Sequence, residues 1–412
     1  MTRVVGERRR LILSFAYFAL LLASYYLIRP VRDALAAGTG AASIKFLASA
    51  VFGVMCLLVP LFGWLVSRVR RAWLLPSIYA FFALNLVGFA AAFRLLPDAH
   101  WLGPAFYVWT TVFNLFVVSV FWSFMADLWR EEEGRRLFGV IAAGGSLGGL
   151  AGPLLARLLV GTLGHAGLAL LAAALLGAAL GVVLLLLREL GEREGDASRL
   201  SLAEPIGGEI LAGLTGLWRS PYLLGIAALV ALGSVLGMFV YIELARAAAA
   251  GFASGEARTA FYAQRDLWVN GGAFVLQLAA VGPLARRLGV RAVLTGSATL
   301  AAFAFAGLTL VPLAGSLIAV NVLLRATEFG LGKPARDMLY TVVSTEAKYK
   351  SKNLIDTVIY RAMDAAAGWL HAGLSLLGLS LAGIAAAASG LALLLLGIAW
   401  RVGSGYRQRG GH

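Results

Sequence analysis

Twelve apolar segments, each long enough to cross a lipid bilayer, recur along the chain. A helix rises about 1.5 Å per residue, so roughly 20 apolar residues span the ~30 Å hydrocarbon core. The segments lie at 11–36, 43–66, 73–96, 103–127, 137–160, 166–188, 221–247, 262–284, 290–312, 314–332, 354–377 and 380–400. Because a spanning segment must satisfy its backbone polar groups internally, we expect an all-α integral membrane protein with twelve transmembrane helices.

The distribution of charge agrees with membrane insertion and predicts an orientation. Apolar residues make up 60% of the chain, charged residues 14%, and the formal net charge is +14. Most lysines and arginines fall in loops that alternate with nearly uncharged loops, which is the positive-inside pattern and not a nucleic-acid signal. We therefore expect both termini in the cytoplasm. The single cysteine, Cys56, lies in an apolar segment, which excludes a disulfide framework and a cysteine-based zinc site.

A long polar segment divides the chain. Residues 189–219 lie between the sixth and seventh apolar segments and begin with a charged run. They end in a predicted interfacial helix, 206–218, which Ser220 and Pro221 stop. The predicted order is an N-terminal six-helix bundle at 1–188, a cytoplasmic linker at 189–220, a C-terminal six-helix bundle at 221–400 and a cytoplasmic tail at 401–412.

An internal repeat supports two equivalent halves. The loop after the second segment runs from Gly63 to Leu75, and the loop after the eighth runs from Gly282 to Leu294. A glycine, a leucine, two basic residues and a final leucine fall at nearly the same offsets in both. The loops resemble the loop signature of the major facilitator superfamily, although the first has Ser67 where an aspartate is usual. The resemblance implies two parallel six-helix halves around a central cavity.

Two arginines stand near the end of the first apolar segment. Arg29 and Arg32 are three residues apart and share a helix face, and Asp33 follows directly. Each arginine at membrane depth costs about 2.5–3.5 kcal/mol on insertion scales, so the charge needs a reason. One interpretation is that both side chains mark the end of the helix and extend to the interface. The other is that they line a water-filled cavity and are partly neutralised by Asp33.

Four further segments carry charges that a purely structural span would avoid. Their polar residues are Tyr241, Glu243 and Arg246; Arg265 and Asp266; Asn321, Arg325 and Glu328, followed by Lys333, Arg336 and Asp337; and Asp356, Tyr360, Arg361 and Asp364. A cationic pocket suits an anionic substrate, because guanidinium offers paired donors to phosphate or carboxylate. The alternative is a set of intrahelical ion pairs that stabilise the spans. These pairs are Glu243–Arg246, Arg325–Glu328 and Arg361–Asp364.

A glycine-rich run at 144–153 favours close helix packing over phosphate binding. It lies inside a predicted span, contains no lysine and has small residues at four-residue spacing. The stretch 330–334 also lacks the phosphate-loop pattern, since proline stands where serine or threonine is required. No ATPase motif is visible, so any active transport is expected to be secondary. The four histidines, His371 among them, show no ligand spacing, which leaves proton coupling to the acidic residues.

Six stretches carry a closer resemblance. They are Ile28–Asp33, Ala42–Leu47, Val118–Phe124, Ser220–Tyr222, Lys333–Tyr340 and Lys348–Asp356. These motifs resemble the ATP/ADP translocases of plastids and obligate intracellular bacteria. The resemblance implies a facilitator fold and nucleotide exchange, with matched positions at Arg32, Lys348, Lys350, Lys352 and Asp356. The chain departs from that family at Ala48, where the family has lysine, and at Tyr241, where it has glutamate.

We therefore expect a secondary transporter that moves a phosphate-bearing anion by alternating access, with nucleotide exchange as the leading case. The alternatives are a proton-coupled carrier of a non-nucleotide metabolite or amphiphile, and a non-transporting membrane partner. The predicted substrate-binding residues are Arg29, Arg32, Tyr26, Tyr241, Arg246, Arg325, Arg336, Lys348, Lys350, Lys352 and Arg361. The predicted charge-balance or coupling residues are Asp33, Glu243, Glu328, Asp356 and Asp364.

The sequence also predicts the setting in which the chain works. We expect an integral protein of a bacterial inner membrane whose partners are a small anionic substrate and the lipid bilayer. No residue pattern indicates covalent catalysis, so the chain is not expected to be an enzyme, to need a cofactor or a metal, or to bind nucleic acid. A chain of this kind can work as a monomer.

Overall fold

A computed structural model describes residues 2–68, 71–129, 131–191, 217–218, 220–344, 351–352 and 354–410. Helices make up nearly all of this part of the chain, and no β-strand occurs in it. Inside a bilayer the backbone has no water to bond, and a helix satisfies its polar groups internally. Nine helices in the described residues are long and apolar enough to cross a membrane.

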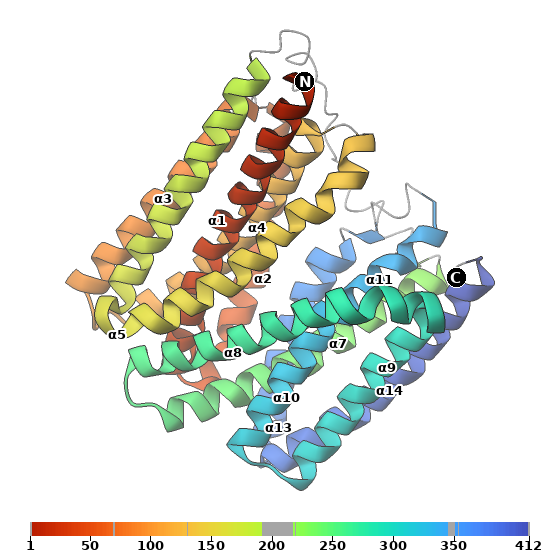
Figure 1. The fold of residues 1–412 in the computed structure, drawn as a ribbon. Helices are drawn as coiled ribbons and strands as arrows, with labels where there is room; N and C mark the ends of the chain where they lie inside the picture. The colour runs from red at the N-terminus through yellow and green to blue at the C-terminus, as the bar shows by residue number, and fades with distance from the viewer. Residues whose placement is uncertain are drawn as a thin grey trace. The chain divides into compact units, whose positions relative to one another are not determined.

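The helices of the first half of the sequence follow the predicted apolar segments (Figure 1). They are α1 Thr2–Gly38, the 3-10 turn η1 Ala41–Ser43, α2 Ile44–Arg68, α3 Arg71–Leu95, α4 Leu102–Leu128 and α5 Glu131–Gly191. Gly164 interrupts α5 with a φ of 61° and a ψ of −173°. Because glycine adopts positive φ at little cost, the chain turns there. The helix α5 therefore contains both the fifth and the sixth predicted spans.

The described residues of the second half include three π-helical stretches that the sequence did not reveal. Its elements are α7 Pro221–Gly251, α8 Gly255–Leu276, η2 Gln277–Val281, α9 Gly282–Leu310, α10 Ala314–Thr327, η3 Glu328–Gly332, α11 Lys333–Met338, η4 Leu339–Val342, η5 Leu354–Ile359, α13 Tyr360–Leu376 and α14 Leu381–Gln408. The π-helices are η2, η3 and η5. Gly289, with a φ of 80°, breaks α9, so the residues before it continue α8 through η2. Residues 206–216 of the predicted interfacial helix lie outside the described residues.

The chain forms two compact units. Unit 1 comprises Met1–Thr39, Leu57–Ile206 and Phe252–Leu267, and unit 2 comprises Gly40–Cys56, Gly207–Gly251 and Trp268–His412. Each unit thus takes one segment from the other side of the predicted linker at 189–220. Most of that linker lies outside the described residues, so the contiguous domain boundaries stay a prediction.

Aromatic rings fill the core of unit 1. Tyr17 of α1 packs edge-on against Phe121 of α4, with ring centroids 4.8 Å apart, and its hydroxyl hydrogen-bonds that of Tyr79 of α3. Trp109 stacks on Phe113 at 5.3 Å, with the ring planes 4° apart. Aromatic pairs contribute about 0.5–1.5 kcal/mol each beyond the burial of their area. These contacts make Trp109 part of the core and join α1, α3 and α4.

The helix α7 is the central element of unit 2. It packs against α10, α13 and α14, and α14 also packs along α9. The buried core of the unit includes Ile226 of α7, Leu339 of η4 and Ile355 of η5. Because α7 contacts three helices, polar side chains on its inner face meet side chains from each of them. The candidate site forms around this inner face of α7.

The glycine run of α5 packs on the backbone of α1, as its spacing predicted. A Cβ atom added at Gly148 would lie 2.3 Å from the carbonyl oxygen of Ala19, and one at Gly152 would lie 2.7 Å from that of Ala23. Only a residue without a side chain allows two helices to approach this closely. The expectation of a helix-packing face, instead of a phosphate loop, is confirmed.

We predict that Gly148→Ala destabilises the protein by about 1–3 kcal/mol, because the added methyl group overpacks the α1–α5 contact. The matched control is Gly139→Ala on the same helix, where an added Cβ meets nothing within 4 Å. The control should be neutral or more stable, since alanine favours a helix over glycine by about 0.8–1.0 kcal/mol. Thermal unfolding of the detergent-purified variants measures both. Equal melting temperatures for the two variants would contradict the contact.

Candidate functional site

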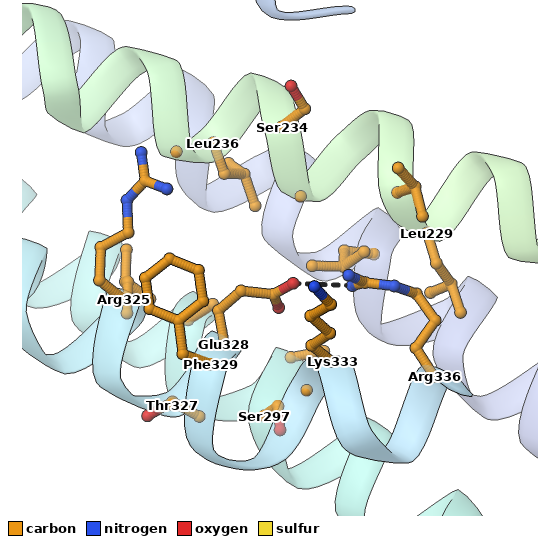
Figure 2. A pocket seen from close by; sticks show the side chains of 18 of the residues that line it. Leu229, Ser234, Leu236, Ser297, Arg325, Thr327, Glu328, Phe329, Lys333 and Arg336 are labelled. Atoms are coloured by element: carbon orange, nitrogen blue, oxygen red, sulfur yellow. Dashed lines mark hydrogen bonds and ion pairs between the residues drawn. The ribbon is translucent and has the colours of Figure 1, made fainter. Parts of the chain in front are cut away.

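A cavity of about 320 Å³ lies within unit 2. Apolar side chains of α7, α9 and α14 line it, together with charged side chains that come from the chain from α10 through α13 (Figure 2). The charged lining residues are Arg325, Glu328, Lys333, Arg336, Asp356, Arg361 and Asp364. Pockets for small molecules commonly measure about 300–1,000 Å³ and combine apolar walls with a few polar groups. The cavity has this character.

Two π-helical turns supply acidic side chains to the cavity. Glu328 begins η3, and Asp356 lies in η5. Pro334 follows η3 closely and has no N–H to donate to the preceding turn, which is a local cause of irregular helix. π-turns place one extra residue in the helix and occur often at functional sites. The pattern of apolar residues gave no signal for either turn.

Ion pairs compensate part of the charge in the cavity. Arg336 Nη1 lies 2.8 Å from Glu328 Oε1, and Arg361 Nη1 lies 3.4 Å from Asp364 Oδ2. The Ser234 hydroxyl of α7 donates to Asp364 Oδ1 at 2.5 Å. The expected pair of Arg361 with Asp364 is confirmed.

The expected pair of Arg325 with Glu328 is wrong, because Glu328 instead bonds Arg336, eight residues later. A π-turn adds one residue to a helical turn. The residue eight positions later therefore lies nearly where the residue seven positions later would lie in a regular α-helix. Seven residues are about two turns, which places both side chains on one face. The helix irregularity therefore changes the partner.

Arg325 is left with no ion-pair or hydrogen-bond partner within the described residues. In Figure 2 its side chain rises toward α7, while the dashed line joins Glu328 and Arg336. A Cβ atom at Gly237 of α7 would lie 3.8 Å from Arg325 Nη2, at ordinary contact distance, so the guanidinium lies beside this glycine. Asn321 lies one turn earlier on α10, is 1% exposed, and its Oδ1 has no partner in the described structure. Arg325 and Asn321 thus present unsatisfied polar groups to the cavity.

The lining of the cavity carries a net positive charge. Four cationic side chains face three acidic ones, for a net charge of 4 − 3 = +1. Subtracting the two ion pairs leaves Arg325 and Lys333 against Asp356. A free guanidinium in a half-buried site binds an oxyanion strongly, because its planar donors match the anion and water screens the charge little. The geometry therefore suits an anionic ligand.

The arginines of the first helix lie in a different arrangement, in unit 1. Arg32 Nη2 lies 2.6 Å from Asp33 Oδ1, and Arg265 Nη2 lies 3.0 Å from Asp33 Oδ2. Arg265 also bonds Asp266 Oδ1 at 2.5 Å, and Arg29 Nε lies 3.7 Å from Asp266 Oδ2. Asp33 is 0% exposed and Arg265 is 2% exposed. We call these five residues the buried ion cluster.

In the buried ion cluster, both arginines of α1 have carboxylate partners. Aromatic rings complete its surroundings: the Arg29 guanidinium lies 5.4 Å from the Tyr26 ring, and that of Arg32 lies 5.2 Å from the Tyr107 ring. Arg29 and Asp33 are buried, so neither extends to an interface. Three guanidinium groups against two carboxylates leave a net charge of 3 − 2 = +1 in the cluster.

The remaining predicted residues have varied positions. Tyr241 is buried in α7, and Arg246 bonds Glu243 at 2.8 Å, so this expected intrahelical pair is confirmed. Lys352 pairs with Asp337 at 2.8 Å. Two further predicted residues, Lys348 and Lys350, lie outside the described residues.

The structure also assigns contacts to residues that the sequence analysis did not select. Arg265 and Asp266 were noted as charged but not placed in the site, and they complete the buried ion cluster. His371 was set aside for lack of ligand spacing, yet it contacts Glu243. One signal was present in the sequence: His371 follows Asp364 by seven residues and so shares its helix face.

Comparison with known proteins decides the family. A family model described as the Major Facilitator Superfamily matches residues 10–335. The chain belongs to the major facilitator superfamily. The fold class predicted from the twelve apolar segments is thereby confirmed. The chain is an integral membrane protein with a transporter fold, and its family indicates a transporter and not an enzyme. A sequence search of curated proteins found no significant match.

Solved structures of other transporters share the fold. A bacterial homologue of the iron transporter ferroportin, in an inward-facing state, has a TM-score of 0.64 and 14% identity, and the match covers 97% of this chain and 99% of that one. A POT family transporter in complex with a thioalcohol-conjugated peptide has a TM-score of 0.63 and 14% identity over 96% and 94% of the two chains. A bacterial homologue of the human lysosomal transporter Spinster has a TM-score of 0.58 and 13% identity over 98% and 97%. At these identities the likeness concerns the fold alone.

We predict that Arg265→Gln destabilises the protein by about 3–5 kcal/mol, because Asp33 and Asp266 each lose a hydrogen-bonded guanidinium in a buried site. Arg136→Gln is the control, since Arg136 pairs with Glu7 but has a side chain that is 66% exposed. An exposed pair contributes about 0–1 kcal/mol, so this variant should melt near the wild type. Thermal unfolding in detergent provides the comparison.

A second substitution makes the explanation specific. Asp33→Asn should cost less stability in the Arg265→Gln variant than in the wild type, because the contact between Asp33 and Arg265 is already lost there. If Asp33→Asn cost the same stability in both backgrounds, the contact between Asp33 and Arg265 would not be the cause of the loss.

Proposed function

We propose that this superfamily member is a secondary transporter that moves an anionic, phosphate-bearing substrate by alternating access. Exchange of nucleotides of the ATP/ADP type is the specific case that the motif resemblance favours. The observation that carries the proposal is Arg325, which faces the cavity of unit 2 without a partner in the described residues. A cation that the protein leaves unpaired in a half-buried site is a position where an anion completes the charge balance.

The arrangement suggests how an anion is held. The Arg325 guanidinium can donate two parallel hydrogen bonds to the oxygens of a phosphate or carboxylate. Lys333 adds a mobile positive charge on the same lining. The ring of Tyr360 also lines the cavity, 5.4 Å from the guanidinium of its neighbour Arg361, and offers a surface for a planar group. The phosphate and the planar base of a nucleotide would thus bind to different sides of one cavity.

The internal ion pairs suggest how binding is linked to conformational change. Glu328 and Asp364 engage Arg336 and Arg361 in the structure. An entering anion competes with these carboxylates for the same guanidinium groups. Ligand binding shifts a conformational equilibrium only through different interactions in its two states, and exchange of ion-pair partners is such a difference. In this proposal Asp356 and Asp364 balance charge, while Arg325 and Arg336 hold the substrate.

A second candidate function is a proton-coupled carrier of a non-nucleotide metabolite or amphiphile. One observation favours it: Glu243 is buried in α7 and lies 2.7 Å from the ring nitrogen of a buried histidine, His371. Histidine serves as a proton carrier in many proteins, and its contact with a buried carboxylate is what favours this candidate. The two candidates share the fold and differ in the cargo and in what drives its movement.

We predict that phosphate-bearing ligands raise the melting temperature of the detergent-purified protein. The panel consists of ATP, ADP, other nucleoside phosphates, inorganic phosphate and sugar phosphates. A ligand present at about 100 times its dissociation constant stabilises the folded protein by about 2.7 kcal/mol. The shift should be lost in Arg325→Gln, because this variant keeps hydrogen-bond donors but lacks the charge.

The matched control for this experiment is Arg94→Gln. Arg94 is exposed near the end of α3 in unit 1, so the variant loses the same charge outside the cavity. Its ligand-induced shift should equal that of the wild type. A wild-type protein that no phosphate compound stabilises would refute the phosphate-bearing cargo. A shift that survives in Arg325→Gln would refute the assigned binding residue.

A further inference from the structure

A second cavity, of about 270 Å³, lies in unit 2 where α9 and α14 pack side by side (Figure 1). Three arginines contribute to its lining, and no acidic residue of the described chain does. The lining residues are Arg287, Leu288, Gly289, Val290, Arg291, Gly403, Tyr406 and Arg407. We call this cavity the arginine pocket. It shares no lining residue with the cavity of the candidate site, so a ligand bound there is separate from the proposed cargo.

The turn at Gly289 brings the arginines of the two helices together. Its φ of 80° lies in the left-handed region, which glycine adopts at little cost. Arg287 and Arg291 flank this turn, two residues to either side. A Cβ atom added at Gly289 would lie 4.0 Å from Arg407 Nη2, so the Arg407 guanidinium reaches from α14 to the turn in α9. Cationic side chains from both helices therefore meet at one place.

A close contact between α9 and α14 holds the third arginine. A Cβ atom added at Gly403 would lie 2.6 Å from Cγ of Arg291, so the stem of Arg291 packs directly on the glycine. The Arg291 guanidinium donates to the Ser404 hydroxyl at 3.5 Å. Gly403 is buried, whereas Arg287 and Arg407 are exposed. The arginine pocket thus has a buried inner side and an open cationic rim.

The three arginines have no acidic partner in the part of the chain that the structure describes. By contrast, Arg9 pairs with Glu189 at 2.9 Å, and Lys352 pairs with Asp337 at 2.8 Å. The positive-inside pattern accounts for arginines in a loop, but it does not account for their meeting around one cavity. Three like charges repel one another, and an anion placed between them removes this repulsion.

The surroundings of the arginine pocket match the surface of a bilayer. The twelfth predicted apolar segment ends at residue 400, and the pocket lies just beyond it. Trp400 lies three residues before Gly403, so both share a helix face, and its side chain is 55% exposed. Tryptophan is enriched where hydrocarbon meets the headgroups. Leu288 is 57% exposed on the α9 side. An arginine cluster therefore adjoins apolar side chains that lipid can cover.

We propose that the arginine pocket binds the phosphate of an anionic phospholipid headgroup. Guanidinium groups offer paired donors to phosphate oxygens. Basic pockets between transmembrane helices on the cytoplasmic side bind such headgroups, and the positive-inside pattern predicts that side for this loop. The volume of the pocket is below the about 300–1,000 Å³ of sites that enclose a whole small molecule, which suits a headgroup whose acyl chains stay outside. Free phosphate lacks the acyl chains that would cover Trp400 and Leu288.

The test is native mass spectrometry of the detergent-purified full chain with added lipid. The probes are phosphatidylglycerol, which carries a net negative charge, and phosphatidylcholine, which has the same phosphate and acyl chains but no net charge. We expect phosphatidylglycerol to bind at least about tenfold more tightly. Arg287→Gln and Arg407→Gln should each weaken its binding about fivefold, which is the contribution of one basic residue near anionic lipid. Both positions are exposed, so without lipid the variants should melt like the wild type.

The matched control is Arg401→Gln. Arg401 is an exposed arginine of the same helix that does not line the pocket, so this variant should bind phosphatidylglycerol like the wild type. Equal binding of the two lipids, or an equal loss in Arg401→Gln, would overturn the proposal.

A competition experiment separates a lipid headgroup from free phosphate. Inorganic phosphate should displace phosphatidylglycerol no better than chloride does at the same ionic strength. Stronger displacement by phosphate would identify a site for the free ion and overturn the assignment to lipid. Because these measurements use no cargo, their outcome is independent of the ligand panel that tests the proposed function.

Discussion

A charge inside a membrane protein must find its compensation within the protein, and this constraint organises both units. In unit 1, Asp33 lies between Arg32 and Arg265, at 2.6 and 3.0 Å. Arg265 comes from Phe252–Leu267, the segment that joins unit 1 from the far side of the linker. Removing one partner from a buried pair leaves an uncompensated charge that costs about 3–5 kcal/mol. The ion pairs therefore hold this segment of α8 against α1, and they also neutralise the charge of Arg265.

Unit 2 satisfies the same constraint incompletely. Glu328 and Asp364 have arginine partners, while Arg325 faces the cavity without one among the described residues. A stable scaffold gains nothing from an unpaired buried cation, whereas a binding site gains affinity and selectivity from it. Each arginine of the buried ion cluster in unit 1 has a carboxylate partner, whereas Arg325 in unit 2 has none among the described residues, and this contrast supports the proposal that the cargo binds in the cavity of unit 2.

The sequence predicted the contacts that depend on local helix geometry. The spacing of Glu243 and Arg246, and of Arg361 and Asp364, placed each pair on one helix face, and both pairs form. The glycines of 144–153 predicted a close helix contact, and α1 provides it. The pair of Arg325 with Glu328 was wrong because Glu328 bonds Arg336, which the π-helical η3 brings onto the same face, and a local irregularity of this kind leaves no trace in apolar periodicity.

By itself, the sequence determined the twelve apolar segments, the helical class and the family, because the thickness of a bilayer and the cost of exposed backbone groups leave a chain of this composition few alternatives. Only the tertiary structure decided which charges are compensated. Asp33 and Arg265 are 232 residues apart, and Glu243 and His371 are 128 apart. No rule of helix spacing connects such residues, since their contact follows from how whole helices pack. The free or paired state of each buried charge, on which the proposed function depends, is therefore a property of the fold.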